Sequence, residues 1–201
     1  ATGFQLRDIA ALCAYNLLLL VEYADWDSQK KIGQGIVNDT AVHKTGETDA
    51  MVYHTGRAHS GDNAAVQYRG IENPWGNVRE FDGINFQNRT AYMCTEPDSY
   101  ADDTTENYIS SGITLPNSGF IKGFGFSSGF PWAFIPNDNG GSETTYIPDY
   151  MYSSSGQNVL NVGGYWTGAS GAGLFSFNAN FDSSVINNVT GARLQFREVK
   201  A

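Results

Sequence analysis

Only one segment of this chain has the periodicity of a long helix. Its apolar residues recur at spacings of three and four, at Ile9, Leu12, Cys13, Leu17, Leu20 and Val21. Asp8 can cap the start of this helix, and Gly33 or Gly35 can end it. A helix with one apolar face needs a partner, and we expect that partner to be a sheet.

From Gly35 onward, the apolar residues form short runs that are typical of strands and are separated by Gly, Asn, Asp and Pro. The strand candidates are residues 36–37, 51–53, 65–68, 91–93, 120–121, 132–135, 173–175 and 193–196. The chain has 23 glycines and one good helix, which indicates an α+β fold with long structured loops. Its 201 residues, without a linker or a repeat, suit a single domain over residues 1–201.

The segment from Met151 to Ala192 carries a single formal charge, Asp182. Its mixture of aromatic residues with Ser, Gly and Asn is the composition of binding loops. The alternative is a buried β region, since sheet cores also lack charge. Asparagines are costly to bury and form strands poorly, which favours exposed loops. The asparagines in question are Asn158, Asn161, Asn178, Asn180, Asn187 and Asn188.

Charge and hydropathy exclude several classes of partner. The chain has 12 basic and 21 acidic residues, a net charge of −9, and no basic stripe for a nucleic acid. The unbroken apolar run Leu17–Val21 is too short to span a membrane, and the first residues lack the pattern of a cleavable signal peptide. We expect Cys13 and Cys94 to be buried free thiols, although a bridge between them is an alternative.

Catalytic and metal-binding motifs are weak. The segment Gly125–Gly129 matches a nucleophile elbow around Ser127, but His43, His54 and His59 all precede it, whereas that hydrolase order needs a later histidine. The three histidines also lack metal-ligand spacing. Loops at 98–103 and 77–82 are rich in oxygen ligands for calcium, yet neither follows a known calcium-loop spacing. We therefore expect no enzyme activity, no metal and no cofactor.

A family resemblance rests on three linked motifs. Residues 75–78 (WGNV), with an acid and an aromatic close behind, resemble the "GNVWEW" core of formylglycine-generating-enzyme-like domains of the C-type-lectin fold. With residues 69–73 (RGIEN) and 82–85 (DGIN), the chain is more similar to phage tail proteins and to the variable proteins of diversity-generating retroelements. The likeness continues at 19–24, Trp26, 28–29, 101–103, 162–166, Gly168, 172–175 and 191–194.

The resemblance implies a C-type-lectin-like fold, in which a helix supports a mostly antiparallel β core that presents a C-terminal loop surface. Trp75 would fill the core, Gly76 would allow close backbone approach, and Asn77 would bond to backbone. Two departures count against oxidase activity. Arg79 stands where the formylglycine-generating enzymes have tryptophan, and the chain lacks their paired reactive cysteines near the C-terminus.

The resemblance also indicates a non-enzymatic ligand-binding domain with a variable region at about 151–192, at a virion tail or a cell surface. Residues that look fixed within the C-terminal region are Gly164, Trp166, Gly168, Gly173, Leu174, Phe175, Gly191 and Arg193. Between them lie the predicted ligand-binding residues, which we expect on one exposed face: Tyr165, Thr167, Ala169, Ser170, Ser176, Phe177, Asn178, Asn180, Phe181, Asp182, Asn187 and Asn188.

The expected ligand is a cell-surface protein or glycan, and further partners are copies of this chain or a larger tail assembly. One alternative is a structural virion component that uses the same surface for subunit contacts. Another is an enzyme of the formylglycine-generating or hydrolytic type.

Overall fold

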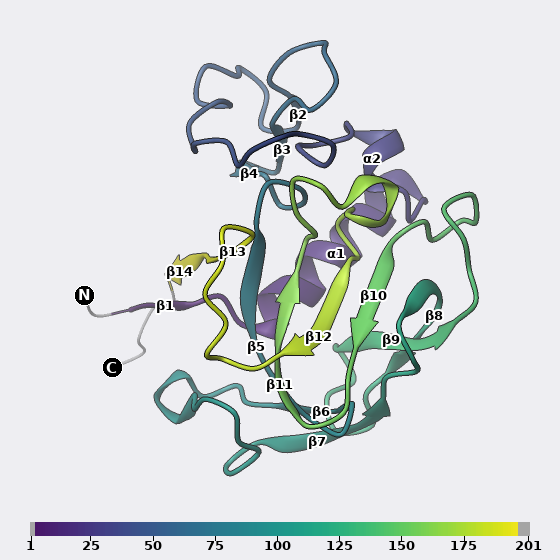
Figure 1. Cartoon of the computed structure of the whole chain (residues 1–201). Coiled ribbons are helices and arrows are strands. Elements are labelled where there is room, and N and C mark those ends of the chain that lie inside the picture. The colour runs from purple at the N-terminus through teal and green to yellow at the C-terminus, as the bar shows by residue number, and fades with distance from the viewer. Residues whose placement is uncertain (1–2, 197–201) are drawn as a thin grey trace.

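The computed structural model describes residues 3–196, which are mostly β with few helices. The helices are α1 (Ile9–Tyr23), α2 (Ser28–Lys31) and the 3-10 turns η1 (Pro97–Ser99) and η2 (Ala169–Gly171). Figure 1 shows α1 behind a large sheet, with β1 (Phe4–Leu6) and β14 (Leu194–Phe196) side by side at one edge of the molecule. The expectation of a β-rich chain with one main helix is confirmed.

The main helix begins where its sequence predicts and ends earlier. The Asp8 side chain accepts a hydrogen bond from the Ala11 amide at 2.8 Å, which caps the start. The predicted stop at Gly33 or Gly35 is wrong, because Ala24 already adopts a left-handed conformation at φ 48° and closes the last turn onto the Leu20 carbonyl. Val21, predicted to lie on the apolar face of the helix, has 80% of its surface exposed to solvent. Leu19, which was not predicted there, is buried instead.

Nine strands form the main sheet, in the order β7-β6-β5-β11-β12-β10-β8-β9, with β13 beside β5. A ribbon of β1 with β14 and a small sheet β2-β3-β4 complete the fold. The strands are β1 (Phe4–Leu6), β2 (Gly56–Arg57), β3 (Val66–Tyr68), β4 (Ile71–Glu72), β5 (Arg79–Gln87), β6 (Thr90–Met93), β7 (Ile109–Thr114), β8 (Gly119–Phe126), β9 (Phe134–Asn139), β10 (Tyr150–Ser153), β11 (Gln157–Val162), β12 (Phe177–Phe181), β13 (Thr190–Ala192) and β14 (Leu194–Phe196).

Strand pairing is mostly antiparallel, as expected; among the strands of residues 3–196, only β10–β12 and β13–β5 pair in parallel. The central strand β5 was not predicted, since charged residues interrupt it, and three short candidates, at 36–37, 51–53 and 173–175, are not strands.

Within the described part of the chain, no helix is long and apolar enough to cross a membrane.

The core lies between α1 and the sheet. It includes Ile84 and Phe86 of β5, Leu160 of β11 and Phe177 of β12, all buried. Cys13 and Cys94 are buried free thiols, as expected, and are not bridged.

The WGN motif ties loops to this core. Trp75 is completely buried, and its indole Nε1 donates to the Gly33 carbonyl at 3.2 Å. Gly76 lies at φ 73°, where a Cβ would meet the Ile36 carbonyl oxygen at 2.7 Å. Asn77 accepts from the His43 amide at 2.8 Å and donates to the His43 carbonyl at 3.0 Å. The motif's expected role in packing and backbone bonding is confirmed.

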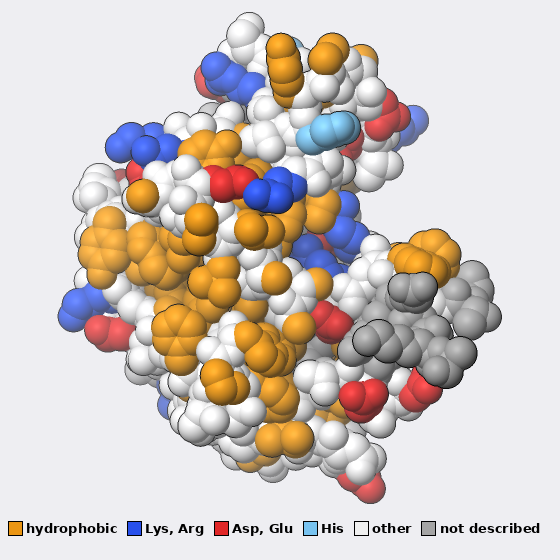
Figure 2. Space-filling model, turned by 180° about the vertical axis from the view of Figure 1, so that it is seen from behind, with side chains coloured by type: hydrophobic (Ala, Val, Ile, Leu, Met, Phe, Trp, Pro, Cys, Tyr) orange, Lys and Arg blue, Asp and Glu red, His pale blue; other side chains and the backbone are white. Residues whose placement is uncertain are grey.

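Apolar side chains are exposed on the rear face of the molecule, as Figure 2 shows. Where α1 meets β8 and β9, Leu17, Phe126 and Tyr146 border a groove of about 260 Å³.

Candidate ligand-binding site

Strand β5 separates its charged residues between the two faces of the sheet. Register pairs Glu80 with Val162 and Asp82 with Leu160, so both acids lie on the core side. There Arg7 contacts Glu80 at 3.1 Å and Asp82 at 3.0 Å, and Arg193 contacts Glu80 at 2.6 Å. Arg79 alternates with these acids and therefore projects from the other face of the sheet. Figure 1 shows that α1 lies on one side of this sheet only.

A row of polar and aromatic residues crosses that outer face. Phe81 of β5 pairs with Asn161 of β11, which pairs with Asn178 of β12, which pairs with Tyr152 of β10. Paired residues project from the same face of a sheet, so these side chains are neighbours. Arg79 precedes Phe81 by two positions and shares the face.

Arg79 lies among three aromatic rings. Its guanidinium carbon is 4.0 Å from the ring centre of Tyr165, 5.3 Å from that of Tyr152 and 5.7 Å from that of Phe181. These distances are within the range of cation–π attraction. We call these four residues the Arg79 cluster.

The charge of Arg79 has no acidic partner among residues 3–196, although only 5% of the residue is exposed. Removal from water lowers the pKa of Arg79, and only Tyr165 and Tyr152 oppose that shift. Buried cations are ordinarily paired, so this one is unusual.

The same strands carry buried polar atoms without a hydrogen-bond partner. They are Oε1 of Gln157, Oδ1 of Asn161, Nδ2 of Asn178, Oδ1 of Asn180 and Oγ1 of Thr190. Thr190 pairs with Arg79 across β13 and β5, so it shares the outer face. Most buried polar groups in proteins are paired, and unpaired ones suit a site that water or a ligand completes. Other unpaired buried atoms lie elsewhere in the described chain, so those near Arg79 support a site only together with its cation.

The structure brings only some of the predicted ligand-binding residues together. Tyr165 and Phe181 meet at Arg79. Thr167, Ala169 and Ser170 lie in and beside η2, near α2, where Gln29 donates to the Ala169 carbonyl. The loop between β12 and β13 carries the exposed Asp182, Asn187 and Asn188. Asp182 directly follows the end of β12, whereas Asn187 and Asn188 come just before Val189, whose carbonyl accepts from the Arg79 amide at 2.8 Å. The expected single cluster is therefore divided, with some of its residues near Arg79 and others near α2.

Three predicted residues are not exposed, and the expectation that they lie at the surface is wrong. Ser176, Phe177 and Asn178 keep 5%, 4% and 2% of their surface exposed. Phe177 points into the core, with its ring centre 6.1 Å from that of Phe86. The reason is that β12 is a central strand of the sheet, not a loop.

The asparagines of the uncharged segment follow the same division. Asn158, Asn161 and Asn178 are buried in β11 and β12, contrary to the expectation of exposed loops. Asn158 is bonded to Ser154, which offsets its burial. Asn180 is partly buried, and Asn187 and Asn188 are exposed.

Sequence reasoning did not select Arg79 or Tyr152 as site residues. Tyr152 lies at the start of the uncharged segment. Arg79 could have been found from the alternation of Arg79 and Phe81 with Glu80 and Asp82, which assigns the cation and the acids to opposite faces of one strand.

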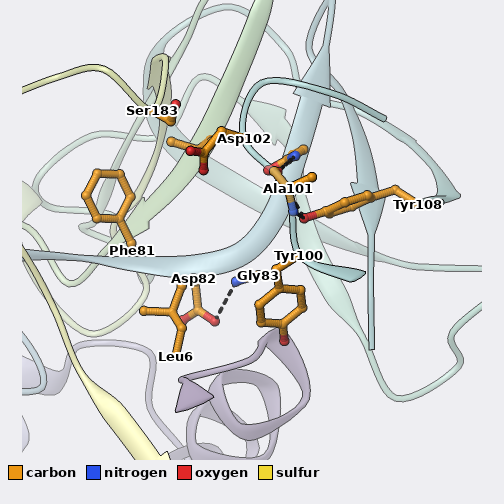
Figure 3. A pocket seen from close by; sticks show the side chains of 11 residues that line it. Leu6, Phe81, Asp82, Gly83, Tyr100, Ala101, Asp102, Tyr108 and Ser183 are labelled. Carbon is orange, nitrogen blue, oxygen red and sulfur yellow. Dashed lines mark hydrogen bonds between the residues drawn. The ribbon is translucent and has the colours of Figure 1, made fainter. Parts of the chain in front are cut away.

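A pocket of about 240 Å³ adjoins the outer face at Phe81. Figure 3 shows Phe81 and Ser183 on one side of it and Tyr100 and Tyr108 on the other. The Tyr100 hydroxyl is buried without a hydrogen-bond partner, and burial raises the pKa of Asp82, which also lines the pocket, to about 7.

The motifs considered for catalysis or metal binding form no such site in the described residues. Ser127 is buried and donates to the Ser111 carbonyl at 2.9 Å. Asp103, in one loop considered for calcium, instead binds the Ser183 hydroxyl at 2.6 Å. No group of three or more His, Cys, Asp or Glu between residues 3 and 196 is placed to hold a metal ion.

Comparison with known proteins adds no family: no protein-family model matches the sequence, and no curated protein matches it.

Proposed function

We propose that this chain is a non-enzymatic ligand-binding domain with a C-type-lectin-like fold. The proposal assigns it to the receptor-binding end of a phage tail or to a retroelement-diversified adhesin. The motif resemblance at 69–85 supports this assignment, together with the buried Trp75 and the bonding of Asn77 to the His43 backbone.

The observation that carries the proposal is the Arg79 cluster. Tyr165, Tyr152 and Phe181 are partly exposed, and they surround a cation on the sheet face that α1 leaves free. Rigid aromatic rings and arginine dominate the energy of many binding surfaces. A virion or cell surface displays many copies of such a site, so modest affinity per copy is sufficient for attachment.

The test is a binding screen against an array of bacterial surface glycans and outer-membrane proteins. We compare the wild-type chain with Tyr165→Ala and Phe181→Ala. Each substitution at the cluster should weaken binding by about 2 kcal/mol or more, in the range of an interface hot spot. Tyr53→Ala is the matched control, because Tyr53 is 79% exposed and lies in a loop outside the cluster.

The proposal would be contradicted if the Tyr165→Ala and Phe181→Ala variants bound every ligand of the screen as tightly as the wild type does. Self-association that the same two substitutions abolish, measured by analytical ultracentrifugation, would favour a structural component that uses this face between subunits. Turnover of a cysteine peptide by a formylglycine-type oxidation would overturn the non-enzymatic assignment.

A further inference from the structure

We propose that the ligand of this face is a sugar that carries a carboxylate, and that Arg79 binds that carboxylate. This inference rests on the proposed function and specifies the ligand class at the same site. The juxtaposition behind it is a buried cation without an acidic partner, bordered by partly exposed rings and by unpaired amide and hydroxyl groups.

The charge of Arg79 calls for an anion from outside the chain. Every nearby acid on β5 is on the opposite face, where Glu80 and Asp82 are already paired with Arg7 and Arg193. The guanidinium binds carboxylates through two parallel hydrogen bonds, which makes a carboxylate its best-matched partner. An incoming carboxylate would replace the water that Arg79 lost on burial.

The groups around Arg79 favour a sugar over a simple anion. Asn178 has an unpaired donor, Asn161 an unpaired acceptor, and Thr190 a hydroxyl that can do either. All three atoms are buried, so a sugar reaches them by displacing the side chains that cover them. Sulfate and phosphate present acceptors only, whereas sugar hydroxyls both donate and accept. The rings of Tyr165 and Phe181 add apolar surface, which suits the C–H face of a pyranose.

The net charge of the chain further restricts the class of ligand that this site can bind. At −9, the protein as a whole repels a densely charged polyanion. A glycan with isolated carboxylates has one anion to place at Arg79 and few others to be repelled.

The experiment is an NMR titration of the ¹⁵N-labelled chain with two probes, methyl β-D-glucuronide and its uncharged counterpart methyl β-D-glucoside. The glucuronide should shift the signals of Arg79, Tyr165 and Phe181 and should bind about ten-fold more tightly than the glucoside, as a charge-assisted hydrogen-bond pair implies. Arg79→Gln should abolish this preference. Arg57→Gln, which removes an exposed cation on β2, should retain it.

The wild-type comparison of the two sugars does not depend on whether Arg79→Gln folds. Equal affinity for both sugars would overturn the role of Arg79 as a carboxylate receptor, and would leave the proposed function standing if the shifts still map to Tyr165 and Phe181. Tighter binding of N-acetylaspartate amide than of the glucuronide would overturn the sugar class. Shifts confined to residues outside the cluster would overturn both the inference and the proposed site.

Discussion

At the scale of single residues, side-chain size and direction decide which aromatic residues serve the core and which serve the surface. Phe177 and Phe181 are both in β12 and belong to the same uncharged segment. Phe177 packs against Phe86 in the core, whereas Phe181 lies beside Arg79. Composition alone treats these two residues alike, and strict alternation would also put both on one face of β12. The register irregularity between β11 and β12, which lies between Asn178 and Phe181, separates them.

Trp75 is the residue whose role the sequence predicted best. Trp75→Ala should lower the free energy of unfolding by about 3–5 kcal/mol, the range for removal of a large buried aromatic. Chemical denaturation measures this loss. Trp132→Ala is the control: Trp132 is partly exposed and should cost clearly less. An unfolding curve for Trp75→Ala that matches the wild type would refute the core role of Trp75.

At the scale of elements, the sequence predicted the start of α1 but not its end. A cap such as Asp8 acts locally and is visible in the sequence, whereas the stop at Ala24 depends on a left-handed turn in a residue that rarely adopts one. β5 escaped prediction for a related reason. Its acids are tolerated on the core side only because Arg7 and Arg193 reach them from distant parts of the chain.

The sequence likewise predicted only part of the candidate site. The uncharged segment did contain Tyr165 and Phe181, which lie in the Arg79 cluster. It could not reveal that β5 supplies the central cation, since residues 79 and 165 become neighbours only through the pairing of β5 with its partners. Binding-loop composition therefore located one side of the site and missed its centre.

The close approach of the loop at Gly76 to the backbone of Ile36 gives a prediction at this scale. Gly76→Ala should destabilise the fold by more than about 1 kcal/mol, because the new Cβ meets the Ile36 carbonyl at 2.7 Å as well as straining φ. Gly156→Ala is the matched control. Gly156 also has a positive φ, but a Cβ there meets nothing within 4 Å. Thermal melts in which the two variants lose equal stability would show that the close approach itself is unimportant.

At the scale of the whole molecule, the sheet separates a face packed against α1 from a face that carries the Arg79 cluster. The loop that connects β11 with β12 is joined to this sheet by Asp149, which is fully buried and accepts hydrogen bonds from the amides of Gly173 at 3.0 Å and Phe175 at 2.7 Å. Its position outside any strand, just before β10, lets a single carboxyl group hold two points of that loop.

Asp149 also makes the stability of the whole chain depend on pH. Burial raises the pKa of Asp149 from 3.8 to about 8. The folded chain therefore holds a proton that the unfolded chain releases between about pH 4 and pH 8, and stability should fall as pH rises through that window. The slope contributed by one such group is at most on the order of 1 kcal/mol per pH unit.

Unfolding by urea at a series of pH values measures this slope. Asp149→Asn cannot titrate, so its stability should fall less steeply with pH than that of the wild type, whatever its absolute value. Asp82, whose pKa burial also raises, remains in both proteins and contributes the same sign to each. A slope that the substitution leaves unchanged would show that Asp149 does not titrate in this window.

The backbone bonds around the loop from 163 to 176 have a consequence for protein engineering. The Gly76 amide donates to the Gly163 carbonyl at 2.7 Å, the Trp166 amide to the Asn77 carbonyl at 3.0 Å, and the Ala169 amide to the Val37 carbonyl at 2.8 Å. None of these bonds uses the side chain of Tyr165, Thr167 or Phe181. Randomising those three positions together would therefore yield a library whose members share one fold, and this chain could be used as a display framework for selecting new binders.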